Sequence, residues 1–365
     1  MLLHYWNKIK LAGDFEVFNR LSQLVICASS LGKLASKELE NLLYPIRVTS
    51  ERVKHLRGGM FGQFYSGGDM FALLEYMRII FLQEVIASEI FNRALSRQRQ
   101  ELQFLYSSIG FLDVLVAISV FQEKTPYFSF PSFQVRTSTS EPLMEFVDLV
   151  HPLMDKPVGY SLKVVRSMLI TGSNASGKST FIKTVAVNAI LAQSIAMVLA
   201  RNYRTDFFKV LTSMSIRDNL EKGESYFVVE AKSMKRLVEE SSQEILCLFA
   251  IDEIFQGTNS VERLAAAQEL LHFFITRPVI CLVATHDYEL VKNLADRYDN
   301  YHFQERIEAG QIVFDYRIEP GYRFSFSALK ILGNLGYPSE IIAGAEKNAQ
   351  LFVQKNWEEY GEIVR

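Results

Sequence analysis

The sequence has few cysteines and no obvious export signal, and its charges nearly cancel. Its three cysteines, Cys27, Cys247 and Cys281, lie far apart in apolar surroundings. They lack metal-ligand spacing, so we expect reduced thiols in a cytoplasmic protein rather than a disulfide framework or a metal site. The first residues turn polar too early for a secretory signal peptide. The net charge of −2 does not by itself indicate nucleic-acid binding.

Long apolar runs are also missing. No uninterrupted run reaches the roughly 18 apolar residues typical of a membrane-spanning helix. The nearest approach is Val185 to Ala200, which contains Asn188, Gln193 and Ser194. We interpret it as a buried helix of a globular domain, and we expect no membrane span in this chain.

The first third of the chain is helical in pattern. Apolar residues recur at three- and four-residue spacing from Phe15 to Leu43 and again from Asp69 to Ala117. This length of helical pattern predicts a long helical hairpin or lever on a globular base. From 124 to 150, prolines alternate with phenylalanines, which favours short extended segments over helix.

A phosphate-binding loop lies near the middle of the chain. The nine residues are Gly172, Ser173, Asn174, Ala175, Ser176, Gly177, Lys178, Ser179 and Thr180. An apolar, strand-like run precedes them and a helical stretch follows, which is the context this motif requires. The two glycines let the backbone wrap a phosphate, and the start of the helix adds its positive dipole end. We predict that Lys178 reaches the β- and γ-phosphates of a nucleotide and that Ser179 binds Mg²⁺.

Two further groups follow predicted strands. The apolar run Ile245–Ile251 is typical of a strand buried on both faces, and it ends in Asp252 and Glu253. We expect Asp252 to hold Mg²⁺ and Glu253 to orient or deprotonate the attacking water. The strand Val279–Ala284 leads to His286, which at this end of a nucleotide-binding sheet is placed to sense the γ-phosphate.

The C-terminal part combines an edge strand with two short helices. Gln311–Ile318 alternates as an edge strand does, and helical patterns follow over Ser325–Leu335 and Ser339–Val353. The apolar faces of these helices are too small to form a core alone. We therefore expect them to dock on the nucleotide-binding body or on a second subunit.

Together these motifs resemble those of the MutS family of DNA mismatch repair ATPases, a branch of the ABC-type ATPases. The phosphate loop is similar to the family's GPNMGGKST, and residues 249–260 are similar to its MDEIGRGTST. Residues 283–290 resemble FATHYFEL, and residues 223–230 resemble GRSTFMVEM. The resemblance covers roughly residues 75–355. It implies an α/β fold in which an ABC-type P-loop ATPase domain follows a helical lever or core domain and precedes a short helical dimerisation element.

The resemblance also implies domain boundaries and roles. The expected domains are a helical lever over 1–125, which a longer protein could extend upstream, an ATPase domain over 126–318 and a helix-turn-helix dimerisation element over 319–365. Ser225 would contact the γ-phosphate bound in the opposite subunit, and Asn259 would lie at the same interface. The implied activity is ATP hydrolysis with Mg²⁺ in composite sites of a homodimer. It would be coupled to a clamp on double-stranded or branched DNA, with further repair proteins as partners.

The sequence departs from the family pattern in several places. Ser173, Ala175 and Ser176 replace Pro, Met and Gly, and Tyr226 replaces the Thr beside Ser225. Within these 365 residues we expect no counterpart of the family's N-terminal mismatch-reading domain. Two alternatives therefore stay open. The same ATPase could act on a ribosome or a membrane complex, or the chain could be a nucleotide-gated scaffold with little turnover.

Overall fold

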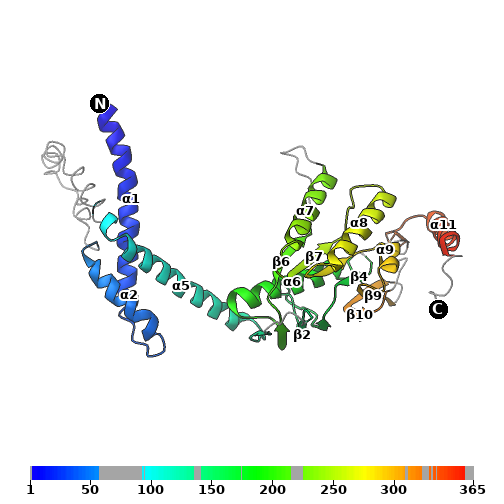
Figure 1. The fold of residues 1–365 in the computed structure, drawn as a ribbon, viewed down its shortest axis with the longest axis horizontal. Helices are drawn as coiled ribbons and strands as arrows, with labels where there is room; N and C mark the ends of the chain where they lie inside the picture. The colour runs from blue at the N-terminus through cyan, green and yellow to red at the C-terminus, as the bar shows by residue number, and fades with distance from the viewer. Residues whose placement is uncertain are drawn as a thin grey trace. The chain divides into compact units, whose positions relative to one another are not determined.

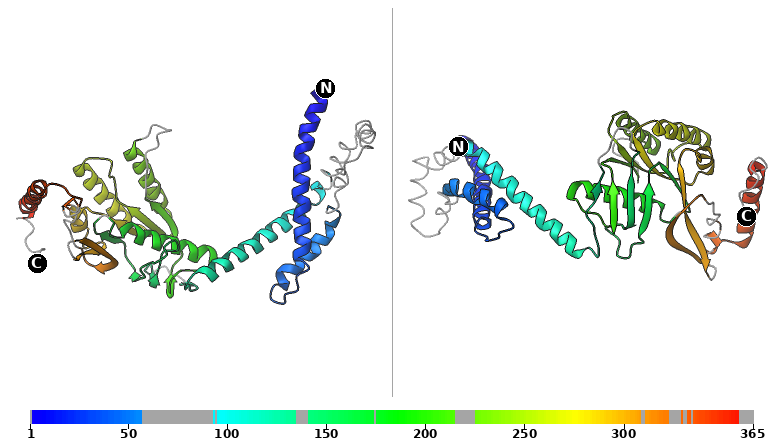
Figure 2. Two further views of the ribbon diagram at one scale, coloured as in Figure 1. Left: turned by 180° about the vertical axis from the view of Figure 1, so that it is seen from behind. Right: turned by 60° about the horizontal axis from the view of Figure 1, so that its bottom comes forward.

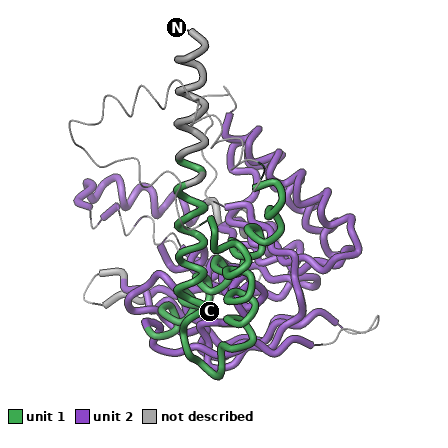
Figure 3. The backbone as a smooth tube through the Cα atoms, turned by 90° about the vertical axis from the view of Figure 1, so that its left-hand side faces the viewer, with its two compact units in different colours: residues 1–123 green, residues 124–365 purple. Residues whose placement is uncertain are grey.

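The computed structural model divides into two compact units, Met1–Glu123 and Lys124–Arg365 (Figures 1 and 3). It describes residues 2–56, 93, 95–134, 141–173, 175–214, 225–308, 311–322, 329, 332–333 and 335–357. About half of the predicted helical stretch Asp69–Ala117, from residue 69 to residue 92, lies outside the described residues, as does Asn174 of the phosphate loop.

The N-terminal unit is helical where it is described. Its helices are α1 (Leu2–Leu31), α2 (Glu40–Arg52), the short 3₁₀ helix η1 (Lys54–Leu56) and α5 (Arg99–Lys124). A small core joins them, with Val25 of α1, Ile46 of α2 and Leu105 of α5 all buried. The helical pattern predicted without interruption from Phe15 to Leu43 is broken over residues 32–39. The chain reverses there, and a Cβ on Gly32 would come within 2.9 Å of the Arg47 Cα.

Helix α5 exposes most of its apolar surface within the structure. Tyr106 and Val116 are 73% and 62% exposed. Among the described residues, α5 is the one helix long and apolar enough to cross a membrane by length and composition, with 6% of its most apolar stretch buried. Length and composition alone do not separate a membrane span from the core helix of a larger assembly.

The C-terminal unit is built on a six-stranded, mainly parallel sheet with the order β10-β9-β4-β8-β7-β6. These strands are β4 (Met168–Thr171), β6 (Lys209–Ser213), β7 (Cys247–Asp252), β8 (Val279–Ala284), β9 (Asp299–Glu308) and β10 (Gln311–Pro320). The predicted strand before the phosphate loop and the two before Asp252 and His286 are therefore adjacent, in the order β4-β8-β7. The predicted edge strand is β10, which pairs antiparallel with β9.

Helices cover both faces of this sheet (Figures 1 and 2). Helix α6 (Lys178–Ile195) packs its buried Phe181 and Val185 against Ile170 of β4 and the residues that point the same way. The other face carries α7 (Tyr226–Ser241), α8 (Ser260–Ile275) and α9 (Tyr288–Asn293). Because side chains alternate along a strand, both faces of the central strands must be apolar. Residues 185–195 of the predicted buried helix Val185–Ala200 form the larger part of α6, but the helix ends at Ile195, where Ala196 takes a left-handed conformation with a φ of 51°.

A second, smaller sheet has the order β1-β5-β2-β3. Its strands are β1 (Ser132–Phe133), β2 (Met144–Leu149), β3 (Tyr160–Val164) and β5 (Asn202–Thr205). Phe146 of β2 and Tyr203 of β5 are buried in the same cluster as α6. The extended segments predicted between 124 and 150 are thus β1 and β2. After β10, helix α11 (Ser339–Trp357) matches the second predicted terminal helix, whereas much of Ser325–Leu335 lies outside the described residues.

Candidate functional site

The phosphate loop runs from the end of β4 to the start of α6 and is tightly curled. Gly172 and Gly177 have φ values of 147° and 111°, which L side chains rarely adopt, and Ala175 lies at 69°. A Cβ at Gly172 would meet the Ser176 Oγ at 2.7 Å. The glycines are therefore required by the geometry of this loop, as the motif predicts.

Lys178, the first residue of α6, folds back over the loop. It is 6% exposed, and its Nζ donates to the backbone oxygens of Gly172 at 2.8 Å and Ser173 at 3.0 Å. Burial lowers the pKa of the Lys178 amine, whereas the charges of Glu253 and Asp252 raise it. A buried cation of this kind is stabilised by an anion placed beside it.

The loop also holds buried hydroxyls that are ready to bind a ligand. Ser173 Oγ and Ser176 Oγ are buried and find no partner among the described residues. Buried polar groups in folded proteins are nearly always hydrogen-bonded, so unsatisfied ones beside a lysine indicate a place for a polar ligand. A phosphate group supplies several acceptor oxygens at such a position.

Carboxylates from β7 face the loop. Asp252 ends β7, and Glu253 follows with a φ of 65°, a left-handed conformation uncommon for a glutamate. Its Oε2 lies 2.8 Å from Nδ1 of His286, which follows β8. The hydrogen bond to Glu253 raises the pKa of His286, and burial acts against that rise. The three predicted residues after β7 and β8 are therefore brought together.

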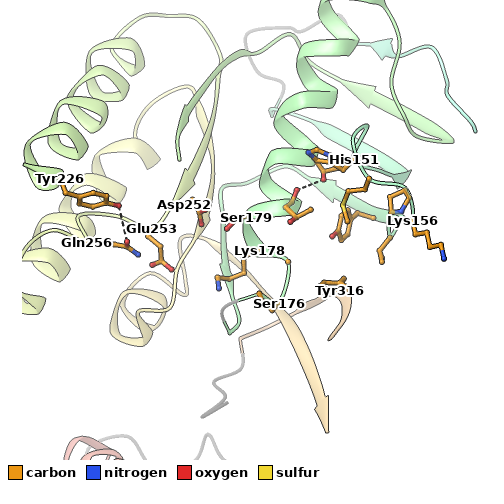
Figure 4. A pocket seen from close by; sticks show the side chains of 18 residues that line it. His151, Lys156, Ser176, Lys178, Ser179, Tyr226, Asp252, Glu253, Gln256 and Tyr316 are labelled. Carbon is orange, nitrogen blue, oxygen red and sulfur yellow. Dashed lines mark hydrogen bonds between the residues drawn. The ribbon is translucent and has the colours of Figure 1, made fainter. Parts of the chain in front are cut away.

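These groups border one cavity of about 650 Å³ (Figure 4). That volume is within the usual range for small-molecule sites, roughly 300–1,000 Å³. The predicted residues that line it are Ala175, Ser176, Gly177, Lys178, Ser179, Thr180, Asp252 and Glu253. His286 is not among the lining residues and reaches the cavity through its hydrogen bond to Glu253.

The rest of the cavity lining includes residues that were not among the predicted site residues. They include His151, Met154, Val158, Tyr160 and Tyr316. Tyr316 lies in a β-bulge of β10 with a φ of 54°, and its Cδ1 is 3.3 Å from where a Cβ of Gly177 would stand. Burial and the nearby charge of Lys183 lower the pKa of His151. Four of these residues lie within residues 151–160, and Tyr316 lies in β10, so two segments of the chain supply this part of the lining.

Ser225 and Asn259, which the resemblance assigns to a partner's nucleotide, do not line this cavity. Ser225 is the N-cap of α7, and its side chain makes no capping hydrogen bond. Asn259 caps α8, where its Oδ1 accepts the N–H of Glu262 at 3.0 Å. The resemblance assigns both residues to the nucleotide of a partner subunit and not to the nucleotide of their own subunit. That role stays a prediction.

The fold and the cavity define an α/β protein with an ATPase-like domain, in which a phosphate-loop motif and an acidic strand end share one site. Comparison with known proteins agrees with this class. The family model of MutS domain V matches residues 168–353, just over half of the chain. The chain belongs to the MutS family, and the resemblance found from its motifs is confirmed.

Curated relatives are similar over different lengths. The DNA mismatch repair protein MutS of Thermus aquaticus is 31% identical over 200 residues, which is 53% of this chain and 24% of that protein. The MutS of Geobacillus thermodenitrificans is 28% identical over 285 residues, 74% of this chain and 30% of its own. The MutS of Streptococcus gordonii is 27% identical over 298 residues, which is 78% of this chain and 33% of that protein. The chain thus spans about a quarter to a third of the length of these relatives.

Proposed function

We propose that this chain binds ATP with Mg²⁺ and hydrolyses ATP slowly to ADP and phosphate. The observation that carries the proposal is the position of Glu253, which lines the same cavity as Lys178 and is held by His286. A glutamate beside a phosphate-binding lysine is suited to activate water. The buried, unpartnered hydroxyls and the tight glycine turns support the fit of a triphosphate.

The residues of the chain have distinct proposed roles. Backbone N–H groups of the phosphate loop and the Lys178 amine bind phosphate oxygens. These groups stabilise the negative charge that develops on the phosphate oxygens during the reaction. Bound Mg²⁺ would supply further charge at the β- and γ-phosphates. Ser179 and Asp252 would hold it, since Mg²⁺ needs few protein ligands when phosphates and waters complete its shell. The part of the chain that the structure describes contains no cluster of three or more His, Cys, Asp or Glu residues suited to another metal.

Glu253 would orient the attacking water and accept its proton. The hydrogen bond from His286 fixes the carboxylate in the direction of the cavity and leaves the second oxygen to meet the water. His286 is 51% exposed, so it can also approach a γ-phosphate. Tyr316, which lines the cavity beside Gly177, offers an aromatic ring on which a base can stack.

The second half of each site would come from another copy of the chain. Ser225 is the N-cap of α7, and its hydroxyl makes no capping hydrogen bond, so it is available to a phosphate of a partner. A helix N-terminus is suited to bind such an anion. Asn259, at the start of α8, would lie at the same interface.

Mixed dimers test this arrangement. Ser225→Ala and Lys178→Ala should each impair ATP hydrolysis when prepared alone. Mixing the two preparations should restore part of the activity, because one site of each heterodimer is then intact. The measurement is the ATPase rate against mixing ratio, and a rate that is simply the average of the two preparations would contradict assembly in trans.

The proposed partner is double-stranded or branched DNA, by analogy with the relatives named as mismatch repair proteins. The test is steady-state ATPase activity without DNA and with homoduplex, mismatched duplex or four-way junction. The salt concentration must be constant because phosphate contacts alone are strongly salt-dependent. Stimulation by one DNA form supports a DNA clamp and identifies its target. Equal rates in all samples would contradict DNA coupling by this chain.

A further inference from the structure

Two neighbouring residues after β8 hold the two ends of one short segment. The segment runs from Glu253 to Arg263 and joins the end of β7 to the first turn of α8. His286 binds its first residue, with Nδ1 2.8 Å from the Glu253 Oε2. Asp287 binds its last residue, with Oδ1 2.6 Å from Nη2 of Arg263. The loop after β8 therefore bridges the catalytic carboxylate and helix α8.

The Arg263–Asp287 ion pair is well enclosed. The two side chains are 19% and 14% exposed, in contrast with the ion pair Lys235–Glu239 on α7, whose side chains are 75% and 64% exposed. Ion pairs in water contribute little, but enclosed pairs with short contacts fix geometry and are costly to break. The Arg263–Asp287 pair is therefore able to hold α8 and the loop in register.

The Asp287 side chain binds Arg263 and does not cap helix α9. It is the N-cap residue of α9, a position where aspartate usually accepts a hydrogen bond from the helix, yet its side chain makes no such bond. Its N–H donates to Thr285 Oγ1 at 3.0 Å, and the Thr285 N–H donates to Ile170 of β4 at 3.0 Å. The loop is thus anchored to the sheet, and the Asp287 carboxylate is turned toward Arg263.

The middle of the same segment is fastened to α7. Glu230 of α7 is 1% exposed; burial raises the pKa of its carboxyl, and the backbone N–H groups of residues 255–257 close to it lower that pKa. Gly257 packs so closely that a Cβ there would lie 2.8 Å from the Cβ of Phe227. A segment held at its start, middle and end moves as one piece, so a displacement at its α8 end reaches Glu253.

We propose that Arg263 and Asp287 are positioning residues that set His286 against Glu253 and couple this contact to the start of α8. The inference rests on the proposed ATP hydrolysis. It adds a means of control, because Asn259, four residues before Arg263, lies on the same segment and would face a partner subunit. In the motif FATHYFEL the position of Asp287 is a tyrosine, so this ion pair is not part of the pattern that identified the family.

The test is a double-mutant cycle on kcat with the full chain. Arg263→Gln and Asp287→Asn remove one charge each; Asp287→Asn keeps the side-chain size, and Arg263→Gln shortens the side chain but keeps it polar. Each should lower kcat about tenfold and change the ADP dissociation constant by less than about twofold. The kcat of the double variant should be no lower than that of the less active single variant, because both changes break the same contact. Losses that multiply in the double variant, or wild-type kcat in both single variants, would overturn the proposal.

Further variants separate positioning from folding. Rates are normalised to the ADP-binding sites in each preparation, so unfolded chains do not contribute. Arg263→Lys keeps the charge and should lose less kcat than Arg263→Gln, whereas an equal loss would contradict a role for the ion pair. Lys235→Gln, at the exposed pair on α7, is the matched control and should leave kcat unchanged.

Glu253→Gln in the same series distinguishes the two proposals. If the wild-type chain does not hydrolyse ATP, the proposed function is wrong and the positioning role fails with it. If the wild-type chain is active and Glu253→Gln is not, the proposed function stands. Wild-type kcat in Arg263→Gln and Asp287→Asn would then show that the positioning proposal alone is wrong.

Discussion

The two sides of the cavity are built in different ways. The phosphate side uses one continuous loop and the ends of two adjacent strands, and its residues, among them Lys178 and Glu253, are close in the fold because β4, β8 and β7 are neighbours. The rest of the lining, which we call the base side, combines residues of the segment 151–160, among them His151 and Met154, with Tyr316 of β10. In the proposed function, the phosphate side carries the chemistry and the base side adjusts affinity.

The largest effect on binding is expected at the phosphate side. Lys178→Ala removes a buried cation that would make charge-assisted hydrogen bonds to phosphate. Such bonds are worth about 1.5–3 kcal/mol, so ATP should bind roughly 10- to 150-fold more weakly. Titration calorimetry measures the change, with the exposed Lys163→Ala as control. An unchanged dissociation constant for Lys178→Ala would contradict the assignment of the phosphate side.

The next effect concerns the segment that follows Glu253. Gly257→Ala places a Cβ 2.8 Å from the Phe227 Cβ and 2.9 Å from its backbone N, so the backbone must shift. We expect a loss of about 1–3 kcal/mol in the free energy of unfolding, measured by denaturant titration. Gly344→Ala in α11 meets nothing within 4 Å and should stabilise its helix by about 0.5–1 kcal/mol. Equal effects of the two substitutions would contradict the close packing described for Gly257.

At the base side a smaller effect is expected. Tyr316→Ala removes an aromatic ring that is 43% exposed at the cavity. Stacking of this kind contributes about 0.5–1.5 kcal/mol, so ATP affinity should fall about 3- to 10-fold while kcat is retained. Tyr316→Phe keeps the ring and should bind as the wild type does. A lower kcat with unchanged ATP affinity in Tyr316→Ala would contradict the role of the base side in affinity.

The smallest effect is a pH dependence at His286. Its pKa is raised in the folded protein, first by the hydrogen bond to Glu253. A raised pKa gives stability that is complete below the unfolded value, about 6.5, and is lost as pH rises through the folded value. His286→Gln should therefore lower the melting temperature most near pH 6 and least at alkaline pH. A melting-temperature difference that grows with pH would contradict the contact.

Sequence patterns predicted the phosphate side because its determinants are local. Two glycines, a lysine and a serine at fixed spacing specify the loop, and a run of apolar residues before Asp252 specifies a strand buried on both faces. Because β7 and β8 are neighbours in the sheet, His286 and Glu253 at their carboxyl ends lie in contact. The same patterns placed the edge strand β10 and the terminal helix α11 within a few residues of their positions.

The sequence could not predict what depends on contacts between distant segments. Tyr316 faces the loop because of a bulge in β10, and an irregularity of one strand leaves no signal in its alternation. The break between α1 and α2 was missed because apolar periodicity continues through residues 32–39. The Arg263–Asp287 pair joins residues 24 positions apart, and neither residue type is unusual at its place.

The most direct test of the central claim compares ATP turnover by the wild-type chain with that of Glu253→Gln. Glu269→Gln, an exposed glutamate on α8, serves as the control. The account predicts that Glu253→Gln still binds ATP but loses more than about 100-fold in hydrolysis, while Glu269→Gln hydrolyses ATP as the wild type does. Unchanged turnover in Glu253→Gln would remove this residue from its role and contradict the proposed mechanism.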